Sequence, residues 1–259
     1  MSEEDNHSGE RVEAHKDKTI TIRKDDLWRY STFVLVAVVV IGAFIMLSGG
    51  NVGSGTGSVV APTGDVEDMS AFLSNQDIYP SVGPENAENV VIEFADFQCP
   101  YCTLTTGLPA WTEGFKAQYG DLVGVAAEVK AAAERGELRF IYVPWAFLGE
   151  ESNSATEAAL CANEQGKFWE MHDAIFLAST GPEEHTGKYS VENLKIIAAG
   201  VTGLDTTAFN SCFEGGGYTS ALSKISSDVR AVGVTGTPAF KVNGKTVSPS
   251  WPAIQAALK

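Results

Sequence analysis

The chain has 259 residues, of which 44% are hydrophobic and 20% are charged, and this composition is too apolar for a disordered protein. The formal net charge is −15, although residues 1–30 hold six of the 18 Lys and Arg residues, so the rest of the chain is strongly acidic. Because contacts to phosphate need Lys and Arg, this charge argues against a nucleic-acid-binding function.

An uncharged apolar run follows the charged N-terminal tail. Residues 31–47 read STFVLVAVVVIGAFIML, and 17 helical residues at ~1.5 Å each span about 25 Å. With Trp28 and Tyr30 as interfacial anchors, this length predicts one transmembrane helix. Six basic residues precede the run and none follows it before Lys116, so residues 1–30 are expected in the cytoplasm and the remainder outside. A cleaved signal peptide is the alternative interpretation, and it too places the folded part outside the cytoplasm.

Residues 48–85 are expected to be a linker and transition segment, with one short helix around Met69–Leu73. Residues 86–259 are expected to form one mixed α/β domain. The predicted elements are a strand over 89–97, a helix over 103–119 kinked at 107–109, a helix over 121–135, a strand over 137–144, a helical stretch over 154–177 broken at Gly166, helices over 191–199 and after Asp205, a helix over 218–232, two strands over 238–242 and 245–248 joined by an Asn243-Gly244 turn, and a last helix capped by Ser250. The strands are thus interrupted by a helical insertion over about 150–232.

Two of the four cysteines, Cys99 and Cys102, form a Cys-x-x-Cys motif between a predicted strand and a predicted helix. This placement is typical of thiol redox chemistry. Cys99 would lie at the helix N-terminus, where unpaired N–H groups and the helix dipole favour a thiolate. Pro100 suits the first helical position. Cys102, one turn further, can close the disulfide or resolve a mixed disulfide.

The alternatives for the motif are a structural disulfide and a zinc site. Zinc would need a second pair of ligands, and no His lies within a few residues of Cys161 or Cys212, so no metal site is predicted. In an oxidising compartment an even cysteine count favours a structural disulfide between Cys161 and Cys212, worth ~4 kcal/mol in the chain-entropy model. Two buried free thiols, or a second redox pair that exchanges with the first, are the alternatives.

Four stretches of the chain resemble the DsbA-like disulfide oxidoreductases of the thioredoxin superfamily. They are EFADFQCPYC at 93–102, CANEQGKFW at 161–169 followed by MHD at 171–173, FNSC at 209–212, and GVTGTPAF at 233–240 followed by VNG at 242–244. The resemblance covers residues 90–259 in the family's order. It implies a thioredoxin-like α/β fold with an inserted helical block, to which the N-terminal transmembrane helix is added.

The resemblance also implies residue roles. Cys99 matches the nucleophile of the family and Cys102 its partner. Thr237 and Pro238 match the loop whose proline is cis and which pairs with a substrate peptide as an added strand.

Glu93 matches an acidic residue beneath the cysteines, which implies that it shuttles the proton of Cys102. Asp96, out of phase by one alternation, competes for this role. Pro100-Tyr101 departs from the Pro-His familiar in strong oxidants and also occurs in the much shorter glutaredoxins, so the direction of electron flow stays open. His172 is expected to pack in the core.

The sequence therefore predicts a protein disulfide oxidoreductase that is anchored in the cell membrane by a single helix, with its catalytic domain outside the cytoplasm. It would introduce disulfides into cysteine-containing secreted proteins through Cys99 and Cys102 and be reoxidised by a membrane partner. Such exchange needs no metal or organic cofactor. The alternatives are a reductase or isomerase of the same fold, and a redox-inert chaperone or binding module.

Overall fold

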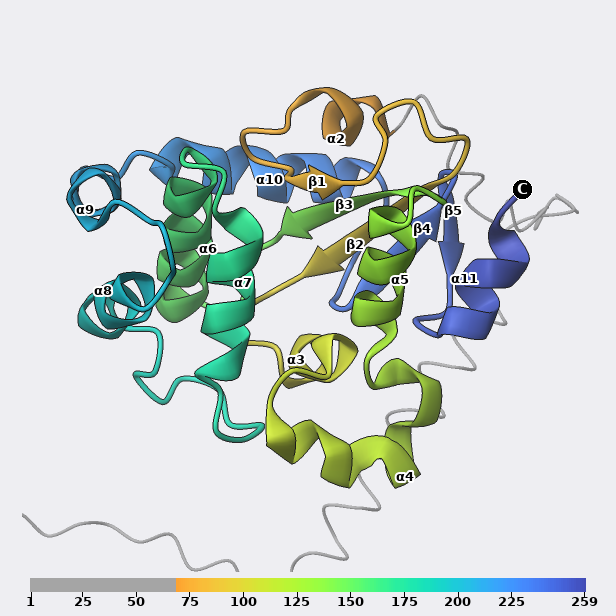
Figure 1. Cartoon of the computed structure of the whole chain (residues 1–259), viewed down its shortest axis with the longest axis horizontal. Helices are drawn as coiled ribbons and strands as arrows, with labels where there is room; N and C mark the ends of the chain where they lie inside the picture. Colours follow the sequence, from red (N-terminus) through yellow and green to blue (C-terminus); the bar gives the residue numbers. More distant parts are fainter. Residues whose placement is uncertain (1–68) are drawn as a thin grey trace, which may run out of the picture. The chain divides into compact units, whose positions relative to one another are not determined.

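A mixed sheet lies at the centre of the computed structural model, which describes residues 69–259 (Figure 1). Its five strands are β1 (Ser81–Val82), β2 (Val90–Ala95), β3 (Arg139–Pro144), β4 (Ala239–Val242) and β5 (Lys245–Val247). Their order across the sheet is β1-β3-β2-β4-β5. Strand β2 runs parallel to β3 and antiparallel to β4. Because β2 is hydrogen-bonded on both sides, the chain that leaves its carboxyl end starts from a fixed position.

Helices cover both faces of the sheet, and Figure 1 shows α5 and α7 on the near face, with strands of the sheet visible between them. The helices are α2 (Ser70–Ser74), α3 (Pro100–Thr106), α4 (Lys116–Tyr119), α5 (Val125–Glu134), α6 (Glu150–Asn163), α7 (Phe168–Leu177), α8 (Val191–Ala199), α9 (Thr206–Glu214), α10 (Thr219–Ala231) and α11 (Trp251–Ala257). Side chains alternate along β2: Val91 and Ala95 join the core with α5, α6 and α7, whereas Ile92 and Phe94 join the core with α2 and α10. The period of two along this strand thus separates two apolar layers.

Helices α6 to α10 form a block between β3 and β4, where the sequence predicts a helical insertion. Cys161 in α6 and Cys212 in α9 are joined by a disulfide, with 5.8 Å between their Cα atoms. The side chain of Asp205 accepts hydrogen bonds from the N–H groups of Thr207 and Ala208 and so caps α9, as the sequence predicts. The disulfide therefore connects two helices of the block and leaves the sheet untouched.

The packed domain begins before the predicted boundary at residue 86. Phe72 in α2 and Tyr79 are fully buried against the sheet, and the Tyr79 hydroxyl donates to Asp228 Oδ2 at 2.5 Å. Strand β1, which the sequence analysis does not predict, pairs antiparallel with β3. Its two residues are too few to show an alternating pattern, and only the neighbouring strand defines it.

The segment predicted as one kinked helix over 103–119 is in fact divided. Helix α3 ends at Thr106, and Gly107 follows with a φ of 64°. A side chain there would bring its Cβ within 3.1 Å of the Gly124 Cα, so the left-handed turn and the close approach both require glycine. After Pro109 the chain continues as a 3₁₀ helix over Ala110–Phe115 and then as α4.

The turn between β4 and β5 has the predicted type I′ geometry, since Asn243 and Gly244 have φ angles of 49° and 81°. The predicted tail at 1–30, the membrane helix at 31–47 and the linker up to residue 68 lie outside the described residues. Between residues 69 and 259, no helix is long and apolar enough to cross a membrane.

Candidate active site

The Cys-x-x-Cys segment lies where the central strand β2 leads into α3. Helix α3 begins at Pro100, with Cys99 as its N-cap residue in an extended conformation (φ −65°, ψ 120°). That conformation is the one a residue before proline favours. Cys102 lies in the first turn of the helix. Both cysteines are free thiols and nearly covered, with 5% of Cys99 and 1% of Cys102 exposed.

The two thiols differ in acidity. The hydrogen bond from Cys102 lowers the pKa of Cys99 most, and contacts with Thr237 and with the N–H groups of Cys102 and Tyr101 bring it, against burial, to about 7. Burial raises the pKa of Cys102 well above its ordinary value, and the hydrogen bond to Cys99 adds to this effect. Near neutral pH, therefore, Cys99 carries a large thiolate fraction and Cys102 keeps its proton.

The loop that enters β4 packs against Cys99. The Thr237–Pro238 peptide bond is cis, and the Cys99 thiol donates to the Thr237 carbonyl oxygen at 3.6 Å. Strand β4 then pairs with β2, so the position of this loop is fixed by the same strand that leads to Cys99. The structure thus brings together the cysteines and the loop residues that the sequence singles out.

Glu93 lies in β2 and is 99% covered, with 1% of its surface exposed. Its Oε1 accepts a hydrogen bond of 2.8 Å from the Thr105 hydroxyl, and its Oε2 has no hydrogen-bond partner among residues 69–259. Burial raises the pKa of Glu93 to about 8, the Thr105 hydrogen bond opposes this, and the negative charge on Cys99 adds to it. The carboxyl is therefore mostly protonated at neutral pH, yet it can lose and regain its proton near pH 8.

Asp96, the competing candidate, has a different environment. Its Oδ1 accepts from the Gln98 N–H at 2.8 Å and the Ser152 hydroxyl at 2.6 Å. Its Oδ2 accepts from the N–H groups of Phe147 and Leu148 at 2.9 and 3.1 Å. The bonds from Phe147 and Leu148 hold the loop after β3 against the loop before Cys99, the Ser152 bond ties that loop to α6, and the Gln98 bond is local. The geometry therefore favours an architectural role for Asp96 and leaves Glu93 as the candidate proton carrier.

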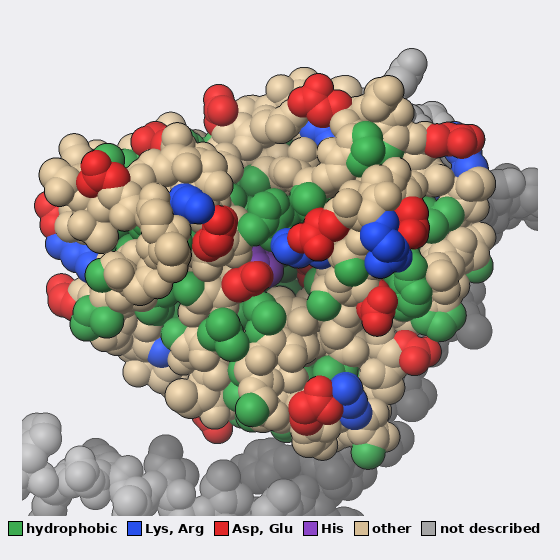
Figure 2. Space-filling view, viewed as in Figure 1, with side chains coloured by type: hydrophobic (Ala, Val, Ile, Leu, Met, Phe, Trp, Pro, Cys, Tyr) green, Lys and Arg blue, Asp and Glu red, His purple; other side chains and the backbone are tan. Residues whose placement is uncertain are grey.

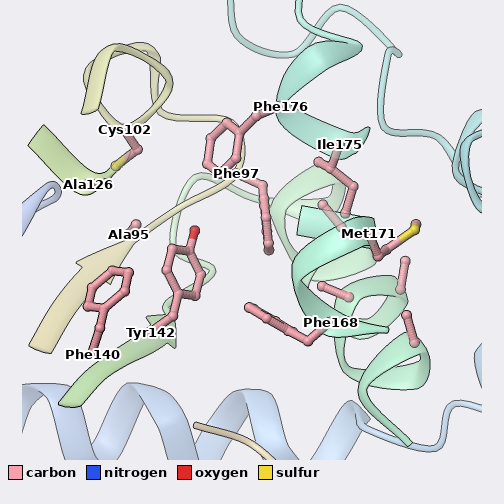
Figure 3. Packing of buried hydrophobic residues seen from close by; sticks show 14 of the residues in the cluster. Ala95, Phe97, Cys102, Ala126, Phe140, Tyr142, Phe168, Met171, Ile175 and Phe176 are labelled. Atoms are coloured by element: carbon pink, nitrogen blue, oxygen red, sulfur yellow. The ribbon is translucent and has the colours of Figure 1, made fainter. Parts of the chain in front are cut away.

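Two further polar residues near the site were not singled out as functional by the sequence. Tyr142 on β3 is directly paired with Glu93, and its hydroxyl is buried without a hydrogen-bond partner in the described part of the chain. Figure 3 shows the Tyr142 hydroxyl turned towards the end of the core where Phe97 and Cys102 lie. His172 packs edge-on against the Tyr142 ring, with 4.7 Å between the ring centroids. Alternation along β3 could have placed Tyr142 beside Glu93, but not its hydroxyl near the cysteines.

Cys161 and Cys212 do not join this site, because both sulfurs are used in the disulfide of the helical block. Within residues 69–259 there is no group of three or more His, Cys, Asp or Glu side chains that could hold a metal ion. What the site offers is an acidic thiol, a protonated thiol and a buried carboxyl, which together suit thiol–disulfide exchange.

Comparison with known proteins agrees with this chemistry. The family profile described as thioredoxin matches residues 122–259. The chain belongs to this thioredoxin family. Over 197 residues it is 24% identical to the probable disulfide bond formation protein D of Bacillus cereus, an alignment that covers 74% of this chain and 80% of that protein.

Two solved structures have a fold similar to that of this chain. A thioredoxin-like oxidoreductase from Silicibacter pomeroyi DSS-3 is 27% identical with a TM-score of 0.54, and the match covers 72% of this chain and 93% of that one. Oxidised BdbD from Bacillus subtilis is 18% identical with a TM-score of 0.54, over 71% of this chain and 92% of its own. The chain is therefore a DsbA-like protein disulfide oxidoreductase of the thioredoxin superfamily, with a thioredoxin-like α/β fold.

Proposed function

We propose that the chain is a membrane-anchored, extracytoplasmic oxidoreductase that introduces disulfides into secreted proteins through Cys99 and Cys102. The observation that carries the proposal is the acidity difference between the two thiols: the pKa of Cys99 is lowered to about 7, and burial raises that of Cys102. A low thiol pKa makes Cys99 the better leaving group, so a mixed disulfide is released at Cys99.

In the proposed cycle, a substrate thiolate attacks Cys99 of the Cys99–Cys102 disulfide. The bond between the two protein sulfurs breaks, and Cys102 leaves with the electron pair. Glu93, protonated at neutral pH because burial raises its pKa to about 8, supplies the proton that Cys102 takes up. A second substrate thiolate then attacks the substrate sulfur, and Cys99 leaves as a thiolate. The substrate gains a disulfide, and the protein holds two thiols until a partner reoxidises it.

Substrate peptides would bind at the loop of Thr237 and Pro238, as an added strand beside Cys99. The contact between the Cys99 thiol and the Thr237 carbonyl oxygen supports this assignment. The oxidative direction is supported by the name of the Bacillus cereus relative, a disulfide bond formation protein. The reoxidation partner would be a membrane protein, because the domain is tethered close to the membrane.

The anchor of this proposal is the uncharged run at 31–47, preceded by six basic residues and by Trp28 and Tyr30. It would leave the N-terminus in the cytoplasm and the catalytic domain outside, where disulfides persist. Protease treatment of intact cells tests this: the catalytic domain should be digested, and a tag on residue 1 should be protected. Protection of the catalytic domain would contradict the topology.

The redox direction is tested by the reduction potential of the Cys99–Cys102 pair, measured by equilibrating the full chain with glutathione buffers. A value near about −120 mV is expected of a disulfide donor. A value near about −270 mV would mark a reductant and overturn the oxidative direction. A pair that does not equilibrate, in a chain whose Cys99→Ser variant retains function, would favour a redox-inert binding module.

A further inference from the structure

Glu93 also lines a pocket that lies between two helices of the domain. A pocket of about 180 Å³ lies between α5 and α7, with Glu93 and Phe140 among the residues that line it. Figure 2 shows this face hollowed between the two helices, with a histidine visible at the centre and acidic and basic side chains around it. The volume has room for several water molecules.

Two buried polar atoms on the pocket wall have no hydrogen-bond partner among residues 69–259. They are Oε2 of Glu93 and Nε2 of His172, on residues that are 1% and 5% exposed. Leaving a buried polar atom without a hydrogen bond costs on the order of 1–3 kcal/mol of folding free energy. Two such atoms on one pocket wall therefore call for an explanation other than packing. Both atoms belong to side chains that can exchange a proton.

His172 is connected to the protein surface through Asp173. Its Nδ1 lies 2.8 Å from Asp173 Oδ1, and the Asp173 side chain is 38% exposed. Because a carboxylate only accepts hydrogen bonds, Nδ1 carries the hydrogen and the lone pair of the neutral ring is on Nε2. Burial lowers the pKa of His172, so the neutral ring is the form present at neutral pH.

We propose that His172 and Asp173 carry the Cys102 proton between Glu93 and bulk solvent, which makes the α5–α7 pocket the proton route of the active site. His172 is then a relay residue that acts through Glu93 and does not touch the substrate. This inference rests on the proposed function of Cys99, Cys102 and Glu93.

The relay matters most when the reduced protein is reoxidised. In the mixed disulfide between Cys99 and its oxidant, protonated Glu93 first passes its proton through water to His172 Nε2, while the Nδ1 proton moves to Asp173 and on to solvent. Cys102 then gives its proton to the Glu93 carboxylate, and its sulfur forms the bond to Cys99. The Cys99–oxidant bond breaks, and the oxidant sulfur leaves with the electron pair. One proton leaves the protein, and two electrons pass to the oxidant.

Charged and titratable groups from three elements face this route. Lys130 and Glu134 on α5 line the pocket opposite Asp173 on α7, and Tyr142 on β3 packs against the His172 ring. Lys130 disfavours a second proton on His172, and Asp173 favours it. Burial outweighs the effect of Asp173 on the pKa and keeps the ring neutral, while Asp173 gives Nδ1 a solvent-facing acceptor.

The test is a single-turnover reaction of the reduced full chain with glutathione disulfide, stopped with acid at successive times. Mass spectrometry separates the Cys99–glutathione mixed disulfide from the closed Cys99–Cys102 disulfide, so the attack on Cys99 and the proton-dependent step at Cys102 are timed separately. His172→Gln removes the relay at similar size. Met171→Leu is the matched control, because Met171 is fully buried on α7 and does not line the pocket.

For His172→Gln we expect closure to slow about tenfold at low buffer concentration, with formation of the mixed disulfide unchanged. Added imidazole or phosphate should restore the rate in proportion to its concentration, whereas the wild type and Met171→Leu should respond weakly. Equal closure rates and equal buffer responses in His172→Gln and Met171→Leu would overturn the proposal. So would a slower closure in His172→Gln that accompanies a loss of thermal stability and is not rescued by buffer. A wild type that forms no mixed disulfide would refute the proposed function itself.

Discussion

The two cysteine pairs of this chain differ in spacing, in oxidation state and in the groups around them. Cys99 and Cys102 are free thiols three positions apart at the start of α3. Cys161 and Cys212 are 51 positions apart and joined across two helices of the inserted block. The first pair lies beside a buried carboxyl and a loop carbonyl oxygen, and the second joins α6 to α9.

The difference shows that surroundings decide what a cysteine pair does. A disulfide that closes a short loop stabilises the folded state little. Cys99 and Cys102 therefore owe their role to the helix N-terminus and to Glu93. A loop of 51 residues restricts the unfolded chain strongly, so the pair at 161 and 212 can act through stability alone. Each of the following changes separates these two roles.

Replacing the acidic thiol should have the largest effect. Cys99→Ser removes the group whose pKa is lowered to about 7, and a serine hydroxyl cannot take its place in exchange. We expect oxidation of a dithiol peptide to fall by about 10³-fold or more. Cys102→Ser is the matched change: it should keep the attack at Cys99 and accumulate mixed disulfides. Substantial turnover by Cys99→Ser would contradict the assignment of the nucleophile.

Removing the other pair should leave the chemistry intact and weaken the fold. The double variant Cys161→Ala, Cys212→Ala loses a 51-residue cross-link, which the chain-entropy model values at about 4 kcal/mol of unfolding free energy. Urea denaturation of the wild type and the variant measures this loss. The exchange rate per folded molecule should stay within about twofold, since additivity holds for independent sites. A proportional loss of activity would show that the two pairs are coupled.

Glu93→Gln tests whether the buried carboxyl serves the first pair. Closure of the Cys99–Cys102 disulfide should slow by about 10–100-fold, because glutamine accepts no proton, and the wild-type increase of this rate up to about pH 8 should disappear. Reactions stopped with acid at successive times, across about pH 6–9, measure the closure rate and its pH dependence. The exposed Glu113→Gln is the control.

Glu93 also predicts a pH dependence of stability. Its folded-state pKa of about 8 lies above the ordinary value, so the unfolded chain loses this proton first as the pH rises. Stability should therefore fall between about pH 4.5 and pH 8, by up to about 5 kcal/mol, and the Glu93→Gln variant should lack this slope. An unchanged slope in the variant would mean that Glu93 is not the titrating group.

The same contrast explains what the sequence could predict. Short-range signals were sufficient for the Cys-x-x-Cys motif, for Asp205 as a helix cap and for the Asn243-Gly244 turn, because each is decided by residues a few positions apart. The extent of the domain depends on how Phe72 and Tyr79 pack against the distant sheet, and this packing leaves no periodic pattern.

The polar environment of the site shows the same limit. The four donors to Asp96 come from residues up to 56 positions away, so the sequence could not separate its role from that of Glu93. His172 is expected to pack, and it does, but its unpartnered Nε2 on the wall of a pocket is a property of the tertiary structure. The membrane helix at 31–47 stays a prediction.

The smallest change concerns the residue between the two active cysteines. Tyr101 is 45% exposed and lies edge-on against Tyr119, with 5.5 Å between the ring centroids, so a substitution there should not disturb the core. In Tyr101→His an imidazolium can stand beside the Cys99 thiolate, and we expect the pKa of Cys99 to fall by about one unit below its value of about 7. Because the reduced form gains that stabilisation, the reduction potential should rise by about 30 mV.

The ultraviolet absorbance of the thiolate against pH measures the pKa of Cys99, and glutathione equilibration measures the reduction potential. Tyr101→Phe is the control that adds no charge. A Tyr101→His protein with an unchanged Cys99 pKa would show that the helix N-terminus and Cys102 already set the acidity of this thiol, whereas a shifted pKa with an unchanged potential would mean that the disulfide form is stabilised equally.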